Sequence, residues 1–192
     1  MSEIVIVRHG ETEWSRSGRH TGNTDIPLNP EGERQAERLR LTLAGRSFGL
    51  ALCSPRRRAR RTAELAGIAG VETDANLIEW DYGYYEGRTT HDIGAELGRP
   101  WSLWEDGVPG GETLGEVAAR TAAVLDRARP ILATGADVAL IAHGHILRVL
   151  AAGWLGLPPA AGALFVLSAG SLGILGFEHD RSVLSGWNIP VA

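Results

Sequence analysis

The chain has 192 residues, 44% of them hydrophobic, which fits one ordinary globular domain with a full core. Its net charge of -4 gives no general attraction to nucleic acid or to an anionic membrane surface, so we expect neither as a partner. No apolar stretch approaches the ~20 residues that would span a bilayer. The single Cys53 cannot form an internal disulfide and no secretory signal is visible, so we expect a cytoplasmic protein.

Residues 4–7 (Ile-Val-Ile-Val) predict a buried strand, and Arg8 and His9 follow at its carboxyl end. In open α/β sheets, ligands bind at that edge. An imidazole beside a guanidinium suits nucleophilic attack on a phosphoryl group, because the arginine offsets the charge of the phosphate. His9 is therefore a candidate nucleophile.

Two helix starts come next. Asn29 and Pro30 form a cap followed by a proline, and the helix should run to about residues 43–44. A short strand over residues 50–53 leads to Ser54-Pro55, which repeats the cap-plus-proline pattern.

Five arginines follow at positions 56, 57, 58, 60 and 61. On a helix, Arg58 shares a side with Ser54 and Thr62, whereas the other four pair off elsewhere. Arg58 also lies near the helix start, where the dipole favours anions. We expect Arg58 to contact phosphate and the other four to form a solvated face, from which Arg57 could touch the rim of the site. The run is also the only feature that suggests nucleic acid.

Residues 80–112 contain no long periodic run. We expect these residues to form an excursion, a segment that leaves the sheet and passes over the active-site edge, with short helices near residues 90–97 and 101–105. This excursion would determine which substrate shapes the site accepts. Trp101 and Trp104 are three apart and would share a helix face, where core packing is at least as plausible as a substrate wall.

The remaining elements complete an α/β pattern. Thr113 to Glu116 fits a capping box and opens a helix to about Leu132. A strand over residues 138–142 ends in His143-Gly144, so two strands ending in His-Gly can place two imidazoles in one pocket. A helix over residues 146–155 follows, and then strands over 163–167, 172–177 and 183–187. Alternating strands and helices predict the α/β class with a mostly parallel sheet.

His143 and His145 could in principle ligate zinc. No nearby set of cysteine, histidine or aspartate completes such a site, so we expect no metal.

The chain contains, in this order, Arg8-His9-Gly10-Glu11-Thr12, residues 21–28, 54–59 and 79–87, Gly111-Glu112-Thr113 and Ala142-His143-Gly144. Together these motifs resemble those of the histidine phosphatase superfamily, which has the phosphoglycerate mutase-like fold. Within it, residues 14–18 and the His143-Gly144-His145 variant look most like the sedoheptulose bisphosphatase and small acid phosphatase branch. The resemblance implies a three-layer α/β/α fold and a single domain over residues 1–192. It implies no cofactor, and such enzymes often dimerise, so a homodimer is an open expectation.

The resemblance also assigns roles to residues. His9 would accept the phosphoryl group as a phosphohistidine, and Arg8, Arg58 and His143 would surround the phosphoryl oxygens. Glu79 would act as proton donor and base. The substrate contacts it suggests are Ser15 (where many relatives carry asparagine), Thr21, Gly22, Gly144 and His145.

The leading hypothesis is a metal-independent phosphomonoesterase acting on small phosphorylated metabolites such as sugar phosphates or bisphosphates. A cofactor-dependent phosphoglycerate mutase is the nearest rival. Family mutases have longer chains and a neighbouring pair of arginines in the middle excursion, whereas this chain has only the separated Arg88 and Arg99. A catalytically silent module that binds phospho-ligands is the rival of another class.

Overall fold

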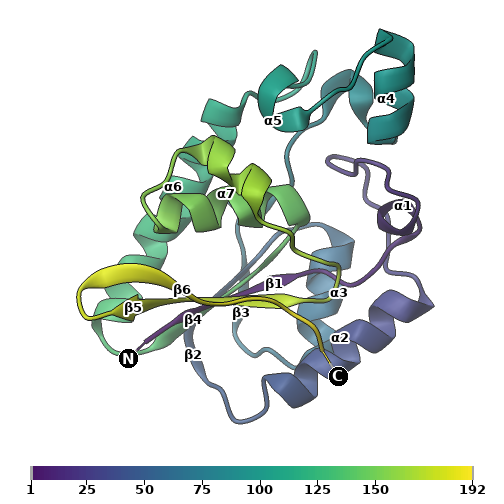
Figure 1. The fold of residues 1–192 in the computed structure, drawn as a ribbon. Coiled ribbons are helices and arrows are strands. Elements are labelled where there is room, and N and C mark those ends of the chain that lie inside the picture. Colours follow the sequence, from purple (N-terminus) through teal and green to yellow (C-terminus); the bar gives the residue numbers. More distant parts are fainter. Residues whose placement is uncertain (1, 192) are drawn as a thin grey trace.

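The sheet at the centre of the molecule has six strands in the order β3-β2-β4-β1-β5-β6 (Figure 1). The structure is a computed structural model, and it describes residues 2–191. The strands are β1 (Ile4–Arg8), β2 (Phe48–Cys53), β3 (Val71–Thr73), β4 (Asp137–Ala142), β5 (Leu172–Glu178) and β6 (Arg181–Ile189). The first four pair in parallel, whereas β5 and β6 are antiparallel, which confirms the mostly parallel sheet.

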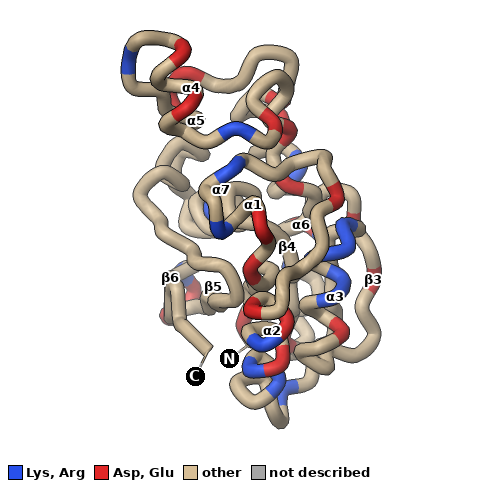
Figure 2. Tube along the Cα trace, turned by 90° about the vertical axis from the view of Figure 1, so that its right-hand side faces the viewer, with Lys and Arg blue, Asp and Glu red and all other residues tan. Residues whose placement is uncertain are grey.

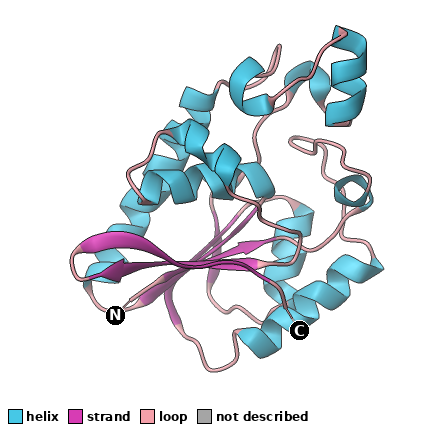
Figure 3. Cartoon of the chain, in the orientation of Figure 1, coloured by secondary structure: helices cyan, strands magenta, loops and turns pink. Residues whose placement is uncertain are grey.

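Helices cover both faces of this sheet (Figure 3). On one face lie α2 (Pro30–Thr42) and α3 (Arg57–Leu65), and on the other lie α6 (Leu114–Ala133) and α7 (Gly144–Trp154). Successive side chains of a strand point to opposite faces. In β1, Ile4 and Ile6 therefore join the core beneath α6 and α7, while Val5 and Val7 join the core beneath α2 and α3. These two cores make the predicted three layers.

The predicted caps of two long helices are present. The Asn29 side chain accepts a hydrogen bond from the backbone N–H of Gly32 at 2.8 Å, at the start of α2. At the start of α6, Glu116 accepts from the backbone N–H of Thr113 at 2.8 Å, and the Thr113 hydroxyl accepts from that of Glu116. Each cap satisfies amides that have no partner within the helix.

Shorter elements lie beyond the carboxyl ends of the parallel strands (Figure 1). They include α1 (Glu13–Arg16) and, in the excursion, α4 (Thr90–Leu97) and α5 (Leu103–Asp106). The backbones of Arg19 and Thr89 form an isolated β-bridge, and the backbone N–H of His20 donates to the carbonyl of Arg88 at 2.9 Å. The excursion is thereby fastened to the loop that follows α1.

Ser54 does not cap a helix, so this prediction is wrong. The residue before α3 is Arg56, and the first free amide, that of Arg57, donates to the Asp25 carboxylate at 2.9 Å. The Ser54 hydroxyl instead meets Nε2 of His143 at 2.7 Å. A remote carboxylate therefore supplies the cap, and the hydroxyl is left for the site.

Two further predictions are wrong. Residues 163–167 form no strand, because Pro159–Leu164 is a 3₁₀ turn whose carbonyls at Gly162 and Ala163 accept from the Arg148 guanidinium. Trp101 precedes α5, so it shares no helix face with Trp104.

Charges of both signs lie along α2 and α3 (Figure 2). Arg61 pairs with Glu33 and Glu64 at 3.1 and 3.0 Å, while Arg57 and Arg60 are exposed. The arginine run is thus partly neutralised and solvated. No helix within residues 2–191 is long and apolar enough to cross a membrane.

Candidate active site

Two histidines meet where β1 and β4 end. These strands pair in parallel with Arg8 opposite Ala142, so the next residues, His9 and His143, leave the sheet side by side. The backbone N–H of His9 donates to the Ala142 carbonyl at 3.0 Å, and the two imidazole centroids are 5.0 Å apart. The structure therefore brings together the two His-Gly strand ends that lie far apart in the sequence.

His9 is held as a neutral imidazole with one free nitrogen. Its Nδ1 lies 2.7 Å from the carbonyl of Gly10, so we assign the proton to Nδ1 and the lone pair to Nε2. Burial, followed by the charges of Arg58 and Arg8, holds the pKa of His9 well below its usual range. A neutral imidazole with an unprotonated Nε2 is the form that can attack phosphorus.

The position after His9 has no room for a side chain, which explains the glycine at position 10. A β-carbon at position 10 would stand 2.2 Å from the Gly32 carbonyl oxygen, so a larger residue would displace the first turn of α2. The Gly10 amide donates to the Thr62 hydroxyl of α3 at 3.1 Å. The turn that presents His9 is thus fixed by two helices.

Arg58 is fully buried behind the two histidines. Its Nε donates to Nδ1 of His143 at 3.1 Å, and its terminal nitrogens donate to the carbonyls of Thr21 and Thr24, both at 3.0 Å. Because Nδ1 of His143 accepts, Nε2 carries the proton and donates to the Ser54 hydroxyl. Burial, then Arg58, lowers the pKa of His143 well below its usual value.

Arg8 brings a second guanidinium to His9. One of its terminal nitrogens donates to the Leu167 carbonyl, while its Nε is buried without a partner among the described residues. Its head lies against Gly144, where a β-carbon would stand 3.3 Å from Cζ. A buried donor without an acceptor is costly unless a ligand satisfies it, so Arg8 is suited to bind an anion.

The Glu79 carboxylate lies at the start of α7 and is 5% exposed. Its Oε1 accepts from the amides of Trp80 and Ile146 at 3.0 and 2.8 Å, whereas Oε2 accepts from the amide of His145 at 2.9 Å. Since a carboxylate oxygen has two lone pairs, Oε2 keeps one for a proton.

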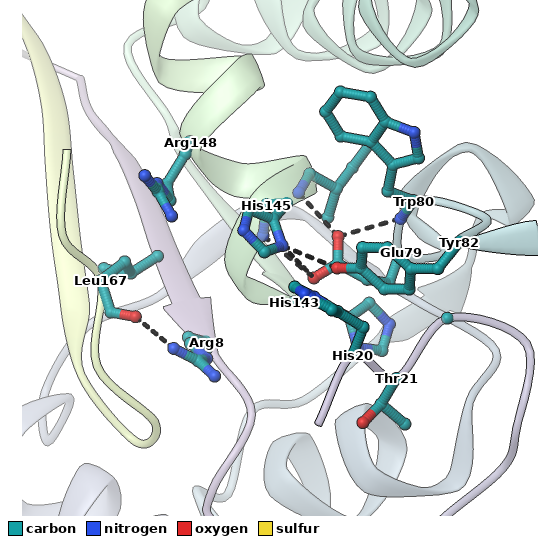
Figure 4. Close-up of polar contacts among 12 residues, drawn as sticks. Arg8, His20, Thr21, Glu79, Trp80, Tyr82, His143, His145, Arg148 and Leu167 are labelled. Carbon is teal, nitrogen blue, oxygen red and sulfur yellow. Dashed lines mark hydrogen bonds and ion pairs between the residues drawn. The ribbon is translucent and has the colours of Figure 1, made fainter. Parts of the chain in front are cut away.

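Arg8, His9 and Glu79 border a cavity of about 160 Å³ (Figure 4). Seven predicted site residues line it: Arg8, His9, Ser15, Thr21, Glu79, Gly144 and His145. Arg58 and His143 lie behind this lining, and Gly22 also lies outside it, its amide donating to Glu86 at 3.0 Å. The Ser15 hydroxyl donates to the carbonyl of Thr12 at 3.1 Å, in the cap of α1.

The sequence model described as the histidine phosphatase superfamily (branch 1) matches residues 4–190. The chain belongs to this superfamily. It is 41% identical over 183 residues to an acid phosphatase of Mycobacterium tuberculosis, covering 92% of this chain and 87% of that protein. It is 37% identical over 182 residues to the sedoheptulose 1,7-bisphosphatase of Saccharomyces cerevisiae, covering 80% and 67%.

A solved structure agrees with the sequence relationships. The open reading frame Rv3214 of Mycobacterium tuberculosis matches with a TM-score of 0.94 and 37% identity, over 100% of this chain and 99% of that one. The predictions of fold and superfamily are therefore confirmed. The chain is an enzyme of the histidine phosphatase superfamily, and phosphatases are among its relatives.

The cavity has lining residues that the sequence did not predict. They are Gly18, Arg19, His20, Tyr82, Arg148 and Leu167. Arg148 could have been found, because it lies on the predicted helix that follows His145; α7 begins at Gly144, so residues 145 and 148 share a helix face. The others come from loops, where no periodic pattern indicates direction.

His20, Tyr82 and His145 form an uncharged cluster on the wall of the cavity. The Tyr82 hydroxyl lies 2.6 Å from Nδ1 of His145, and the ring centroids of His20 and Tyr82 are 4.8 Å apart. Burial lowers the pKa of His20 to about 4 and that of His145 well below its usual range. Burial also raises the pKa of Tyr82 well above its ordinary value.

The zinc alternative finds little support in these contacts. His143 is engaged by Arg58 and Ser54, and His145 by Tyr82. Within residues 2–191, no three histidine, cysteine or acidic side chains gather in a way that could hold a metal ion.

Proposed function

We propose that the chain hydrolyses small phosphate monoesters through a phosphohistidine on His9. The observation that carries the proposal is the free Nε2 of a neutral His9 beside the guanidinium groups of Arg58 and Arg8, the latter with a buried Nε that has no partner among the described residues. In the first step Nε2 attacks phosphorus, the N–P bond forms and the bond to the leaving oxygen breaks. In the second step water attacks the same phosphorus, the N–P bond breaks, and inorganic phosphate leaves.

Arg8, Arg58 and His143 would stabilise the negative charge on the phosphoryl oxygens. Phosphoryl transfer is catalysed chiefly by positioning and electrostatics, so two fixed cations and a neutral hydrogen-bond donor around the phosphoryl oxygens can supply this stabilisation. Arg8 offers its unpartnered Nε, and the Nε2 proton of His143 can turn from Ser54 to a phosphoryl oxygen.

Glu79 would move the proton. Its Oε2 would give a proton to the leaving oxygen in the first step and take one from the attacking water in the second. Three backbone amides hold this carboxylate against the cavity, which supports the role.

The relative named as a sedoheptulose 1,7-bisphosphatase supports phosphorylated metabolites, including sugar bisphosphates, as the substrate class. Proteins named as phosphoglycerate mutases are also among the relatives, so mutase activity is the second candidate. However, Arg88 pairs with Glu96 at 2.6 Å and Arg99 with Asp106 at 2.8 Å. Both arginines of the excursion are thus occupied, which favours hydrolysis over binding of a phosphoglycerate carboxylate.

The test is phosphate release from sugar phosphates, sugar bisphosphates, phosphoglycerates and p-nitrophenyl phosphate, in the presence of a chelator. Wild type and His9→Ala are compared. Chelator-resistant release that requires His9 is the expected result. Interconversion of phosphoglycerates without release would support the mutase, and binding without either reaction would support the silent module.

A further inference from the structure

We propose that Arg148 and His145 form a second anion subsite, so that preferred substrates carry another anionic group on the leaving side of the ester. This inference rests on the proposed function, because it places the transferred phosphoryl group at His9. It adds the chemical class of the leaving group, which is a phosphorylated acid or a second phosphate ester.

Arg148 reaches the same cavity as His9 from a different place. It stands on α7, four residues after Gly144 and three after His145, and both Arg148 and His145 line the cavity (Figure 4). Four residues of helix rise by about 6 Å. Gly144 lies against Arg8, which in the proposed function binds the transferred phosphoryl group. A second anion bound by Arg148 would therefore be joined to that phosphoryl group by a short chain of carbon atoms.

The guanidinium of Arg148 is already held in position. Its Nε donates to the Gly162 carbonyl at 2.9 Å and one terminal nitrogen donates to the Ala163 carbonyl at 3.1 Å. Its Cζ lies 4.7 Å from the centre of the Trp104 ring. A β-carbon at Gly162 would stand 2.8 Å from that ring, so the glycine permits this packing. A group fixed in this way loses little freedom on binding.

The charge of Arg148 is not matched by an acid of the chain. Among residues 2–191, no carboxylate lies within ion-pair distance, and two carbonyls take two of its five N–H donors. Glu79 is close enough to favour the charged guanidinium, but its oxygens accept from three amides. Burial, the largest influence, lowers the pKa of Arg148, so its charge is partly deprived of water. An incoming anion would compensate this loss.

His145 supplies a neutral donor beside this cation. The Tyr82 hydroxyl keeps its proton and has no other acceptor among the described side chains, so we assign it as the donor to Nδ1 of His145. The Nε2 of this neutral ring then carries a proton. Trp104 contacts both members, with its ring centre 5.5 Å from that of His145. A cation and a neutral donor on one helix face suit a phosphate or a carboxylate.

The test compares esters that differ in the charge of the leaving group. We would measure kcat/KM for fructose 1,6-bisphosphate, 3-phosphoglycerate and glycerol phosphate with wild type, Arg148→Met and Arg148→Lys. Arg148→Met should lower the ratio of an anionic ester to glycerol phosphate about tenfold or more, and Arg148→Lys should restore part of it. The ester that loses more identifies the second anion as phosphate or carboxylate.

A matched control exists in Arg129→Met. Arg129 also covers a tryptophan, with its Cζ 5.4 Å from the ring centre of Trp154, but it does not line the cavity. Its ratios should equal those of wild type. If Arg148→Met lowered kcat/KM for all three esters by one common factor, the subsite would be refuted.

A binding experiment separates this inference from the proposed function. In the His9→Ala background, titration calorimetry with the same esters needs no turnover. Adding Arg148→Met should raise the Kd of the preferred anionic ester about tenfold and leave that of glycerol phosphate within twofold. An unchanged Kd for both anionic esters would overturn the subsite even in a protein that hydrolyses nothing.

Discussion

Removal of the Arg58 side chain should damage both the stability and the chemistry of the site. Arg58 is 0% exposed and donates to the carbonyls of Thr21, Gly22 and Thr24 as well as to His143. It therefore fastens the loop over residues 21–24 to the end of β4. Arg58→Ala would leave these acceptors without a donor at once.

The cost in stability follows from the number of acceptors. A buried acceptor without its partner costs roughly 1–3 kcal/mol, and water can reach part of the loop once the side chain is gone. With four acceptors at the low end of that range, we expect a loss of about 3–4 kcal/mol in the free energy of unfolding. A domain of this kind is stable by roughly 5–15 kcal/mol, so the variant should remain folded at 25 °C. Urea unfolding followed by circular dichroism measures this loss.

The loss of turnover should be separable from the loss of stability. Removing one fixed donor from a site that stabilises developing charge typically lowers kcat about 10²–10³-fold. We therefore expect that fall for p-nitrophenyl phosphate after normalisation to the folded fraction.

Arg61→Ala is the matched control, three residues along the same helix. Arg61 is partly exposed and pairs with Glu33 and Glu64 on the surface, where such pairs contribute about 0–1 kcal/mol. Its turnover should equal that of wild type. Comparable losses of turnover in both variants would refute the reasoning that burial singles out Arg58.

Three other perturbations test the remaining groups. His9→Ala should abolish turnover and change the free energy of unfolding by less than about 1 kcal/mol, since among the described residues its ring bonds only to the adjacent Gly10; residual His9-independent hydrolysis would contradict its role. Glu79→Gln should slow glycerol phosphate more than p-nitrophenyl phosphate, whose leaving group needs little protonation, and equal losses would argue against proton donation. His20 has its pKa lowered from 6.5 to about 4 by burial, so the folded protein favours its neutral form. That contribution, of the order of 3 kcal/mol, is present above pH 6.5 and is lost as the pH falls from 6.5 towards 4, so His20→Phe should show a weaker pH dependence of urea unfolding below pH 6.5.

The sequence predicted the parts of the site that depend on a single helix or strand, or on the register of one pair of strands. A strand that ends in Arg8-His9 and another that ends in His143 need only parallel pairing to bring the two histidines together, and the alternating pattern indicated that pairing. Asn29 and Thr113 were predicted as caps because a capping side chain acts within its own turn. Local rules were sufficient there.

The errors came from contacts between distant segments. Asp25 caps α3 from 32 residues away, and this releases the Ser54 hydroxyl for His143. A 3₁₀ turn over Pro159–Leu164 occupies the start of the predicted strand, and its carbonyls at residues 162 and 163 accept from the distant Arg148. A period of two or of 3.6 residues cannot reveal which remote side chain takes a carbonyl or an amide, so the loop-borne wall of the cavity was not predicted.

The charges of the site are divided in a way that suits a histidine nucleophile. Burial lowers the pKa of His9, His143, His145 and His20 below the usual range, so the positive charge near neutral pH comes from arginines. An incoming phosphate would by itself favour protonation of His9, which would remove the lone pair needed for attack. Arg8 and Arg58 oppose that protonation, and in the proposed mechanism they would also attract the phosphate. In the proposed mechanism, one pair of fixed cations would therefore both attract the substrate and keep the nucleophile unprotonated, which a site built on charged histidines could not do.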